Sequence, residues 1–566
     1  MFHELYKRYF NRKLPSALLA YFYIGVMMLP NLVLAITEPY NPWSRAVGLI
    51  LPLGFYMTWS VLLRRSGITI WLSFPFIFFG AFQLPLLYLF GNSIIATDMF
   101  TNLLTTNPSE AGELLGNIWP AVLLDILLYV PMLWMATVEI RQKRHIPLMA
   151  RRWIGYPGAV ILALGVMMIV PARKLSGDES VLKNDVFPIN VIYNLKLSIT
   201  EHLRMLHYEQ SSEGFSYEAT RAQEPDEREI YLYVIGEASR AANWQLYGYE
   251  CETTPRLAQM EDVVVFHNLL TQSNTTHKSV PMMLSSIDTH QHDELFLRKG
   301  LPALFNEVGF ETWLISNQAP QKAMVDKLVA DADFLYYEEK ERMDMRLLEK
   351  LREVVESSSA QKLMIILHTY GSHFSYYQRY SRDFARFTPE ADVAISPKQS
   401  EVIGNTYDNS ILYTDYFLGS VIDYLRSLEG CCTAMLYCSD HGEDLFDDRR
   451  GRFLHASPTV TYWQLHVASL AWFSPRYEEL FPWKAESARG NVMAPATTHS
   501  LFHTMADIAS IRSPYLDRDV SLVYPAFDFG RPRYYLSDHN KAVPYSSVGL
   551  KKRDFEEFEK RAIQVK

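Results

Sequence analysis

The stretch AMLYCSDHGE, residues 434–443, joins an apolar run to a group of residues that can bind a metal. Two other apolar runs end in a similar way. Ile230–Ile235 is followed after one residue by Glu237, and Leu363–Leu367 is followed by His368. Open α/β sheets carry their reactive groups at the carboxyl ends of the strands, so these three ends are expected to meet at one metal centre. Adjacent Asp and His offer an oxygen and a nitrogen, a ligand pair suited to zinc.

The pattern around these runs predicts the fold class. After about Glu229, short β-rich runs alternate with amphipathic helical segments, which predicts an α/β domain with a mostly parallel sheet over residues 229–566. The remaining strand candidates are Val263–Val265, Glu311–Ile315 and Val467–Phe473, and the helical candidates are Val325–Ala332, Arg342–Ser357, Ser410–Ser427 and His499–Ile508.

The first 172 residues have a different character. Five apolar stretches are long enough to cross a hydrocarbon core, which takes about 20 residues, and they predict a bundle of five transmembrane helices. Prolines inside them are tolerated where neighbouring helices satisfy the backbone. The stretches are Ser16–Ile36, Ala46–Leu63, Ile68–Phe90, Ile118–Val138 and Ile154–Ala172.

Basic residues predict the orientation of these helices. The loop Gly91–Asn117 contains no Lys or Arg, whereas basic residues gather before the first stretch, after the second and before the fifth. The positive-inside rule places those basic segments in the cytoplasm and, with five spans, everything after Ala172 outside. Three basic residues, Arg45, Arg173 and Lys174, oppose this orientation and are outnumbered.

Residues 173–228 are predicted to connect the two domains. Ile189, Ile192, Leu195, Ile199, Leu203 and Leu206 recur at helical spacing within them. Such an amphipathic helix is expected either to lie on the bilayer surface or to pack on the following domain.

Composition excludes some functions. The net charge is −9, and no basic stripe with interleaved aromatic residues occurs, which argues against a nucleic-acid partner. The four cysteines have no metal-site spacing; Cys431 and Cys432 are adjacent, and Cys438 lies in a predicted core strand. We therefore expect no disulfide framework, although an extracytoplasmic location would permit one.

A hydroxyl-rich segment, SNTTHKSVP (residues 273–281), supplies a candidate nucleophile. A hydroxyl at a helix start beside a cation is activated by the metal and faces backbone amides that favour a phosphoryl group. Spacing alone favours the simpler interpretation, a helix N-cap. A second Ser-Asp-His, at Ser537–His539, lacks the following Gly-Glu and is interpreted as a coincidence or a minor contributor.

Taken together, these motifs resemble the bacterial phosphoethanolamine transferases, membrane enzymes with an alkaline phosphatase/sulfatase-like fold. The resemblance extends to the loop Asp98–Asn107 and so covers nearly the whole chain. The matching positions are Glu237, Arg240, Asn243, Gly248-Tyr249, Thr276, His368, Gly371-Ser372-His373, Asp440-His441-Gly442-Glu443 and Leu454-His455.

The resemblance implies a zinc-dependent transfer of phosphoethanolamine from phosphatidylethanolamine to lipid A or another glycan of the lipopolysaccharide. Glu237, Thr276, Asp440 and His441 would bind zinc (one ion, or two), with Thr276 also the nucleophile. His373 and His455 would act in catalysis, and Asn243, Gln318, Lys322 and His368 would contact the substrate. The protein would be a monomer in the bacterial inner membrane, among membrane lipids, with its catalytic domain in the periplasm.

The chain also departs from the family pattern. Gln272 and Met282 stand where many members flank the nucleophile with a disulfide, and Thr275 offers a second hydroxyl beside Thr276. Two rival functions follow from the sequence. One is a phosphoglycerol transferase or phosphodiesterase of the same fold, and the other is a non-catalytic membrane sensor.

Overall fold

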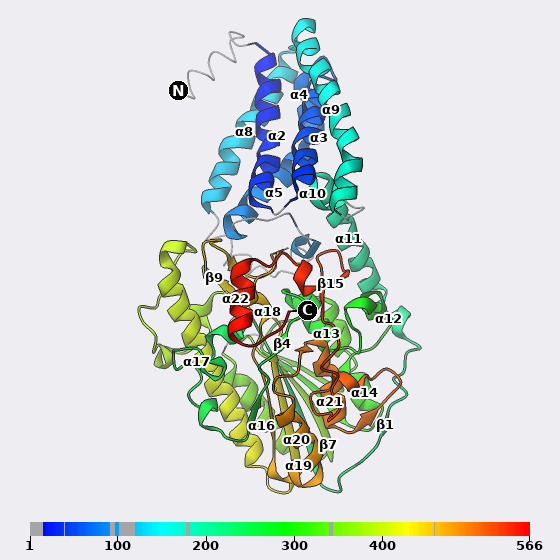
Figure 1. Ribbon diagram of the computed structural model, residues 1–566, viewed down its shortest axis with the longest axis vertical. Coiled ribbons are helices and arrows are strands. Elements are labelled where there is room, and N and C mark those ends of the chain that lie inside the picture. The colour runs from blue at the N-terminus through cyan, green and yellow to red at the C-terminus, as the bar shows by residue number, and fades with distance from the viewer. Residues whose placement is uncertain are drawn as a thin grey trace. The chain divides into compact units, whose positions relative to one another are not determined.

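The computed structural model describes residues 15–38, 40–90, 95, 97–100, 119–176, 181–338, 343–457 and 459–565. The chain divides into two compact units, Met1–Phe100 with Pro108–Ile199 and Thr101–Asn107 with Thr200–Lys566. The first unit is helical and the second contains the sheet (Figure 1).

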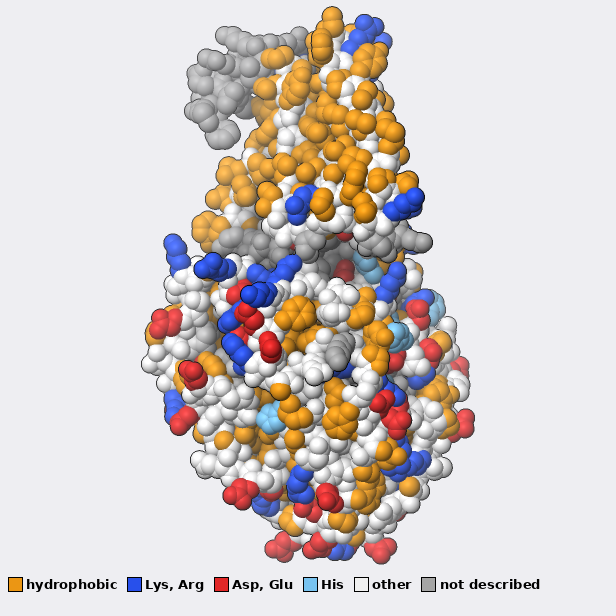
Figure 2. Space-filling model, in the orientation of Figure 1, with side chains coloured by type: hydrophobic (Ala, Val, Ile, Leu, Met, Phe, Trp, Pro, Cys, Tyr) orange, Lys and Arg blue, Asp and Glu red, His pale blue; other side chains and the backbone are white. Residues whose placement is uncertain are grey.

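Helices form at all five apolar stretches of the first unit, but the number of spans differs from the prediction. The helices are α2 (Ala17–Thr37), α3 (Pro42–Ser60), α4 (Ser66–Leu72), α5 (Phe74–Phe90), α8 (Trp119–Arg141) and α9 (Leu148–Ser176). Within the described residues, α2, α8 and α9 are each long and apolar enough to cross a membrane. The pair α4–α5, bent by 62°, makes a fourth span if it is counted as one. Apolar side chains cover the visible surface of this unit (Figure 2).

Of the five predicted spans, the described residues therefore contain three or four, for two physical reasons. Helix α3 begins at Pro42 and carries Arg45 in its first turn, so it falls short in apolar length. The third stretch breaks at Ser73, whose hydroxyl donates to Thr69 O (2.8 Å). The same hydroxyl accepts hydrogen bonds from the side chains of Tyr23 (2.9 Å) and Trp59 (2.7 Å).

Glycines allow α3 and α9 to pack closely. A Cβ atom on Gly54 would lie 2.3 Å from the backbone nitrogen of Leu162, and one on Gly165 would lie 2.8 Å from Leu51 Cα. Small residues at such crossings let helix backbones approach, as is usual between membrane helices.

The connector is largely helical, with α10 (Val181–Asp185), α11 (Ile189–Leu206) and α12 (Tyr208–Ser212). The predicted amphipathic helix is α11, and the division between the two units falls within it, after Ile199. The predicted domain boundaries at residues 172 and 228 stay predictions.

The second unit contains a seven-stranded sheet in the order β3-β11-β8-β2-β7-β5-β6. The strands are β2 (Arg228–Gly236), β3 (Val263–Val265), β5 (Glu311–Ser316), β6 (Phe334–Tyr337), β7 (Lys362–His368), β8 (Cys431–Ser439) and β11 (Ser469–Phe473). Strands β8, β2, β7, β5 and β6 pair in parallel, and β11 runs antiparallel to both of its neighbours. The predicted mostly parallel α/β fold is confirmed. The central strands read as continuous apolar runs because both faces of a parallel sheet are covered.

Several helices accompany the sheet: α13 (Thr276–Met283), α14 (Leu301–Asn306), α15 (Met324–Val329), α16 (Met345–Ser357), α17 (Ser400–Arg426), α18 (Tyr462–Leu465), α19 (Pro475–Leu480), α20 (Pro482–Gly490), α21 (His499–Ile508) and α22 (Lys552–Lys560). Four two-stranded pairs complete the unit: β1 (Thr220–Arg221) with β13 (Ile511–Arg512), β4 (Leu269–Leu270) with β12 (Ala496–Thr497), β9 (Asp444–Leu445) with β10 (Phe453–Leu454), and β14 (Tyr534–Leu536) with β15 (Ala542–Pro544).

The register of the central strands brings their carboxyl ends together. Gly236 of β2 lies opposite Ser439 of β8, and His368 of β7 lies opposite Ile235 and Ser316. Glu237, His368 and Asp440 are therefore all placed at one edge of the sheet.

Candidate active site

Four of the predicted residues gather at this edge. Thr276 Oγ1 lies 3.3 Å from Glu237 Oε1 and 3.2 Å from His441 Nε2. His441 Nε2 lies 3.4 Å from Glu237 Oε1 and 3.4 Å from Asp440 Oδ2. The side chains of Glu237, Asp440 and His441 are fully buried, and Thr276 is the first residue of α13. One helix start and two strand ends thus supply a compact set of two carboxylates, an imidazole and a hydroxyl.

The Asp440 carboxylate leaves one oxygen for a cation. Its Oδ1 accepts hydrogen bonds from the backbone amides of Ala238 (3.1 Å) and His441 (2.7 Å). Its Oδ2 is buried and accepts no hydrogen bond from any described residue. Buried polar atoms almost always have a partner, so this oxygen indicates a missing one. Ligand atoms of Glu237, Asp440 and His441 lie within 4.8 Å of one another, and this donor set fits zinc.

The close packing of these ionisable groups shifts their pKa values. Burial, and then the charge of Glu237, raise the pKa of Asp440 to about 7. For His441 burial acts in the opposite direction, but Asp440 and Glu237 together raise its pKa to about 10. Burial is likewise outweighed at Glu237, whose pKa is lowered by the hydrogen bond and charge of His441. A protonated His441 thus supplies the positive charge that a divalent ion would bring to the same place.

A second group lies beside the first. Glu443 Oε1 is 2.6 Å from His455 Nδ1, and Glu443 Oε2 accepts a hydrogen bond from Tyr376 (2.7 Å). The rings of His441 and His455 have centroids 3.9 Å apart. Burial raises the pKa of Glu443 to about 7, and burial with the charge of His441 lowers that of His455. We did not predict a site role for Glu443, although its place in the Ser-Asp-His-Gly-Glu motif was a signal for one.

His373 lies near both groups. It follows β7 in the loop that begins at Thr369, is half-buried, and has Nδ1 2.5 Å from Phe374 O. Its charge acts on the pKa values of Glu237 and Glu443. Buried Asp344 positions this loop, because its carboxylate accepts hydrogen bonds from the backbone amides of Tyr370 (2.7 Å) and Gly371 (2.9 Å). No local sequence pattern indicated a role for Asp344.

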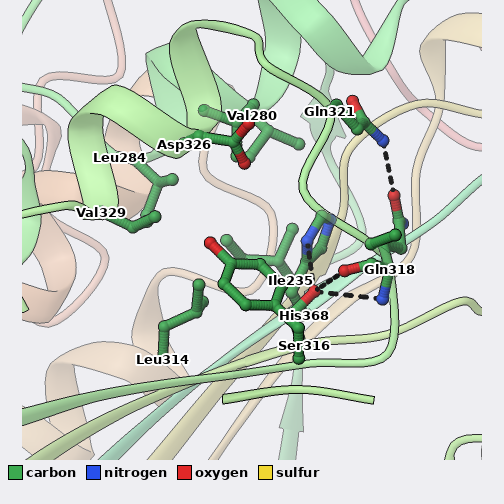
Figure 3. Close-up of a pocket in the computed structure, with 13 residues that line it drawn as sticks. Ile235, Val280, Leu284, Leu314, Ser316, Gln318, Gln321, Asp326, Val329 and His368 are labelled. Carbon is green, nitrogen blue, oxygen red and sulfur yellow. Dashed lines mark hydrogen bonds between the residues drawn. The ribbon is translucent and has the colours of Figure 1, made fainter. Parts of the chain in front are cut away.

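Gln318 contacts the four-residue group directly, whereas the His368 side chain makes no hydrogen bond to it. Gln318 Nε2 donates to Glu237 Oε2 (3.1 Å) and to Thr369 O (2.9 Å). Both residues line the pocket in Figure 3, together with apolar side chains such as Ile235 and Val280. His368 Nδ1 is 3.4 Å from Ser316 Oγ, and burial lowers the pKa of His368 to about 4. His368 is therefore a neutral side chain of this pocket.

The other two predicted substrate contacts are placed differently. Asn243 donates to Asp408 Oδ1 (2.5 Å) and accepts from Arg240 Nε (2.5 Å), so both ends of its amide are engaged in a buried network. Lys322 is exposed in the loop between β5 and α15, and its side chain forms no hydrogen bond or ion pair with any described residue. Neither contacts the four-residue group.

Gln464 connects three loops of the site, and sequence reasoning missed it. Its Oε1 accepts a hydrogen bond from Asn274 (2.8 Å), two residues before Thr276. Its Nε2 donates to Asp444 Oδ2 (2.7 Å) and to Leu454 O (3.2 Å), the residue before His455. The buried amide of Gln464 thus connects the segment before Thr276, the segment after Glu443 and the segment before His455.

Gln272 and Met282 hold the hydroxyl-bearing segment without a disulfide. Gln272 Oε1 accepts a hydrogen bond from the backbone amide of His499 (3.2 Å), and its backbone O accepts one from Leu536 N (2.8 Å). Met282 is fully buried in the main core, and all four cysteines are free thiols. Packing and hydrogen bonds therefore take the structural role of a covalent link.

The second Ser-Asp-His forms the turn between β14 and β15. Lys278 Nζ of α13 donates to the carbonyl oxygens of Ser537 and Asp538, each at 3.3 Å. This turn supports α13 from its backbone, which agrees with a minor contribution.

Comparison with known proteins agrees with this geometry. The family model "Sulfatase" matches residues 229–511, half of the chain, and the model "Phosphoethanolamine transferase EptA/EptB" matches residues 90–202. The chain belongs to the phosphoethanolamine transferase family. This family is part of the sulfatase/alkaline phosphatase superfamily, so the expected resemblance is confirmed.

Two curated relatives show how far the similarity to phosphoethanolamine transferases extends. Phosphoethanolamine transferase EptA of Escherichia coli (strain K12) is 27% identical over 546 residues, which cover 91% of this chain and 97% of that protein. EptA of Salmonella typhimurium is 30% identical over 315 residues, and that match spans 53% of this chain and only 56% of the relative's length.

Solved structures of phosphoethanolamine transferases share the fold. The integral membrane protein lipooligosaccharide phosphoethanolamine transferase A from Neisseria meningitidis matches 90% of this chain and 98% of its own, with a TM-score of 0.69 and 21% identity. The C-terminal periplasmic domain of EcEptC from Escherichia coli, solved in complex with Zn, matches 58% of this chain and 96% of its own, with a TM-score of 0.52 and 24% identity.

Proposed function

We propose that this protein transfers phosphoethanolamine from phosphatidylethanolamine to lipid A, or to another glycan of the lipopolysaccharide, at the periplasmic face of the inner membrane. The observation that carries the proposal is the group formed by Glu237, Thr276, Asp440 and His441, in which Asp440 Oδ2 accepts no hydrogen bond from the described residues. Family membership and the apolar N-terminal helices support a lipid substrate.

The first step is attack by Thr276 on the donor. Thr276 gives up its hydroxyl proton to a neighbouring base, and its Oγ1 forms a bond to phosphorus. The bond from phosphorus to the diacylglycerol oxygen breaks, and that oxygen takes up a proton. The position of Thr276 supports it as the nucleophile. The alternative hydroxyl, Thr275 Oγ1, is hydrogen-bonded to Ser273 Oγ (3.2 Å) and not to the four-residue group. In the second step an acceptor oxygen forms a bond to phosphorus, the bond from phosphorus to Thr276 Oγ1 breaks, and Oγ1 regains a proton.

Glu237, Asp440 and His441, with Thr276, would bind one zinc ion. Bound zinc would lower the pKa of an alcohol and offset negative charge on phosphoryl oxygens. A relative solved with Zn and the fit of the donor set support this. His441, Glu443 and His455 would be the residues for a second ion.

His455 and His373 are proposed to move protons. The Nδ1 atom of His455 is engaged with Glu443, which leaves Nε2 for a leaving or attacking oxygen. Gln318 positions Glu237 through its 3.1 Å hydrogen bond. Lys322, exposed and close in sequence to Gln318, is proposed to contact the substrate from the mobile end of a long side chain. Asn243 is proposed to act through Arg240 and Asp408, and not by direct contact with substrate.

Mass spectrometry of lipid A tests the proposal directly. Cells that express the wild-type chain should gain lipid A species heavier by one phosphoethanolamine unit, and cells that express Thr276→Ala should not. Thr275→Val serves as the matched control, because the Thr275 hydroxyl hydrogen-bonds to Ser273 and not to the four-residue group; this variant should retain the modification. Full modification of lipid A in cells that express Thr276→Ala would show that Thr276 is not the nucleophile. A mass gain of one glycerol phosphate unit in the wild type would mean that the donor lipid is not phosphatidylethanolamine.

A further inference from the structure

The burial pattern of α11 is the reverse of that in a soluble amphipathic helix. Its buried residues are mostly polar: Asn190, Asn194 and Ser198 are each at most 2% exposed. Asn194 Nδ2 donates to Ile95 O (2.8 Å), so part of this polar face is hydrogen-bonded within the first unit.

Apolar side chains occupy the opposite face of α11 and are open to the surroundings. We call these residues the α11 stripe: Ile189, Ile192, Ile199, Leu203 and Leu206, which are 38–59% exposed. They recur at spacings of three, four and seven residues, so they lie along one side of the helix. A polar inner face and an apolar outer face suit a helix whose surroundings are less polar than water.

We propose that the α11 stripe binds the lipid surface, with the helix lying in the head-group region of the bilayer. Continuity along the chain supports this occupant: α11 follows α9, one of the helices long and apolar enough to cross a membrane, with only the short α10 between them. The α9 helix exposes apolar side chains outward in the same way, for example Val160 and Met167. Lys196 is exposed within the stripe, where the long stem of its side chain can cover apolar surface.

This surface differs in kind from the catalytic site. The residues of the stripe include no nucleophile and no metal ligand, and they bind phospholipid through apolar insertion. Because α11 continues past Ile199 into the second unit, lipid binding would keep the beginning of that unit at the bilayer surface, where a phospholipid donor is found.

A fluorescent probe on the full chain tests the proposal without using enzyme activity. Leu203→Cys, labelled with an environment-sensitive NBD group, is reconstituted in vesicles of phosphatidylethanolamine and phosphatidylglycerol. We expect blue-shifted emission that is strongly quenched by lipids carrying a doxyl group near the head group. The matched control is Glu261→Cys, an exposed position at the amino end of β3, the end of the sheet away from the catalytic residues. The unsubstituted chain, labelled in the same way, corrects for the native thiols.

Two outcomes would overturn the proposal. In the first, the Leu203→Cys probe emits as in water and is quenched by aqueous iodide as strongly as the Glu261→Cys probe. In the second, its emission is blue-shifted but insensitive to doxyl lipids, which would mean that protein covers the stripe. As a further check, Ile199→Asp should red-shift a probe at Leu206→Cys, whereas Gln210→Asp, at an exposed position of α12, should not. Because all readouts are optical, they separate this proposal from the proposed transfer reaction.

Discussion

At the residue scale, Asp440 shows how the site is prepared for a cation. One of its oxygens is held by two backbone amides and the other accepts no hydrogen bond. This oxygen has the ion-pair contact with His441 Nε2 at 3.4 Å but no hydrogen bond, so a bound ion would give it a closer partner. The same carboxylate raises the pKa of His441, so a proton and a metal compete for this place.

A change of Gln464 should disturb the positions of the catalytic residues without affecting zinc binding. Gln464→Glu removes the donor to Asp444 Oδ2 and brings two carboxylates together. We expect kcat to fall about 10- to 100-fold, since small displacements of reacting groups have effects of this size. The zinc content should stay unchanged, because no proposed ligand is altered. Steady-state kinetics and metal analysis of the purified protein check this.

The pH profile of Gln464→Glu provides the control for a merely structural defect. Burial raises the pKa of Asp444 to about 7, so a proton shared between the two carboxyl groups can restore a hydrogen bond as the pH falls. The activity of the variant relative to wild type should therefore rise from pH 8 toward pH 6. Gln223→Glu, at an exposed position, should show no such trend. Wild-type kcat in Gln464→Glu would contradict the positioning role.

At the element scale, α21 contains a chain of hydrogen bonds through two neutral histidines. His503 Nδ1 accepts from Asp517 N (3.1 Å), and His503 Nε2 lies 3.1 Å from His499 Nε2. His499 Nδ1 lies 2.8 Å from Ile287 O. Each ring nitrogen either donates or accepts one hydrogen bond in this chain. An added proton on either ring would therefore place two N–H donors opposite each other. Burial lowers the pKa of both histidines.

Acid should therefore destabilise α21. A lowered pKa in the folded state means that the stability is present above the ordinary value of about 6.5 and is lost as the pH falls below it. Each histidine contributes a slope of up to about 1.4 kcal/mol per pH unit. We expect the melting temperature of the detergent-solubilised protein to drop between pH 7.5 and pH 5.5, and to drop less for His503→Gln.

The control for this prediction is a histidine on the surface. His207→Gln, at an exposed position, should melt with the same pH dependence as wild type. If His503→Gln also keeps the full dependence, then the acid sensitivity originates elsewhere.

At the scale of the whole molecule, the proposed metal joins segments that are distant in sequence. Glu237, Thr276 and Asp440 follow or begin three different elements, so an ion bound to all of them would stabilise only the folded chain. At a concentration 100 times its dissociation constant, such an ion adds about 2.7 kcal/mol of stability. Treatment with EDTA should therefore lower the melting temperature and abolish transfer, and added zinc should restore both.

Glu237→Gln is the matched control for the effect of EDTA. With one proposed ligand changed to its neutral isostere, the variant should bind zinc weakly and its melting temperature should respond little to EDTA. An equal shift in wild type and variant would mean that EDTA acts at another place.

The absence of a covalent link around the nucleophile also has a global consequence. All four cysteines are free, so treatment with TCEP should leave the melting temperature and the activity unchanged. Reduction of a structural disulfide typically costs 2–5 kcal/mol, a loss that would be plain in the melting curve. A large decrease would reveal a link between Cys251 or Cys431 and another thiol.

The sequence by itself determined the sheet class and pointed to the residues that gather at the centre of the candidate site. Continuous apolar runs predict central parallel strands, because both faces of such a strand are buried, and the residues after them must then share one edge. Glu237, Thr276, Asp440 and His441 could therefore be proposed from their positions at strand ends and at a helix start, together with the family resemblance.

Only the tertiary structure decided which side chains face that edge and what holds them. The antiparallel direction of β11, the bend at Ser73, the bridge made by Gln464 and the polar inner face of α11 depend on contacts between segments far apart in the chain. Local sequence does not encode these contacts, because each arises where two elements cross. The hydrogen bonds of Asn243 and the exposure of Lys322 depend in the same way on neighbours that come from other parts of the fold.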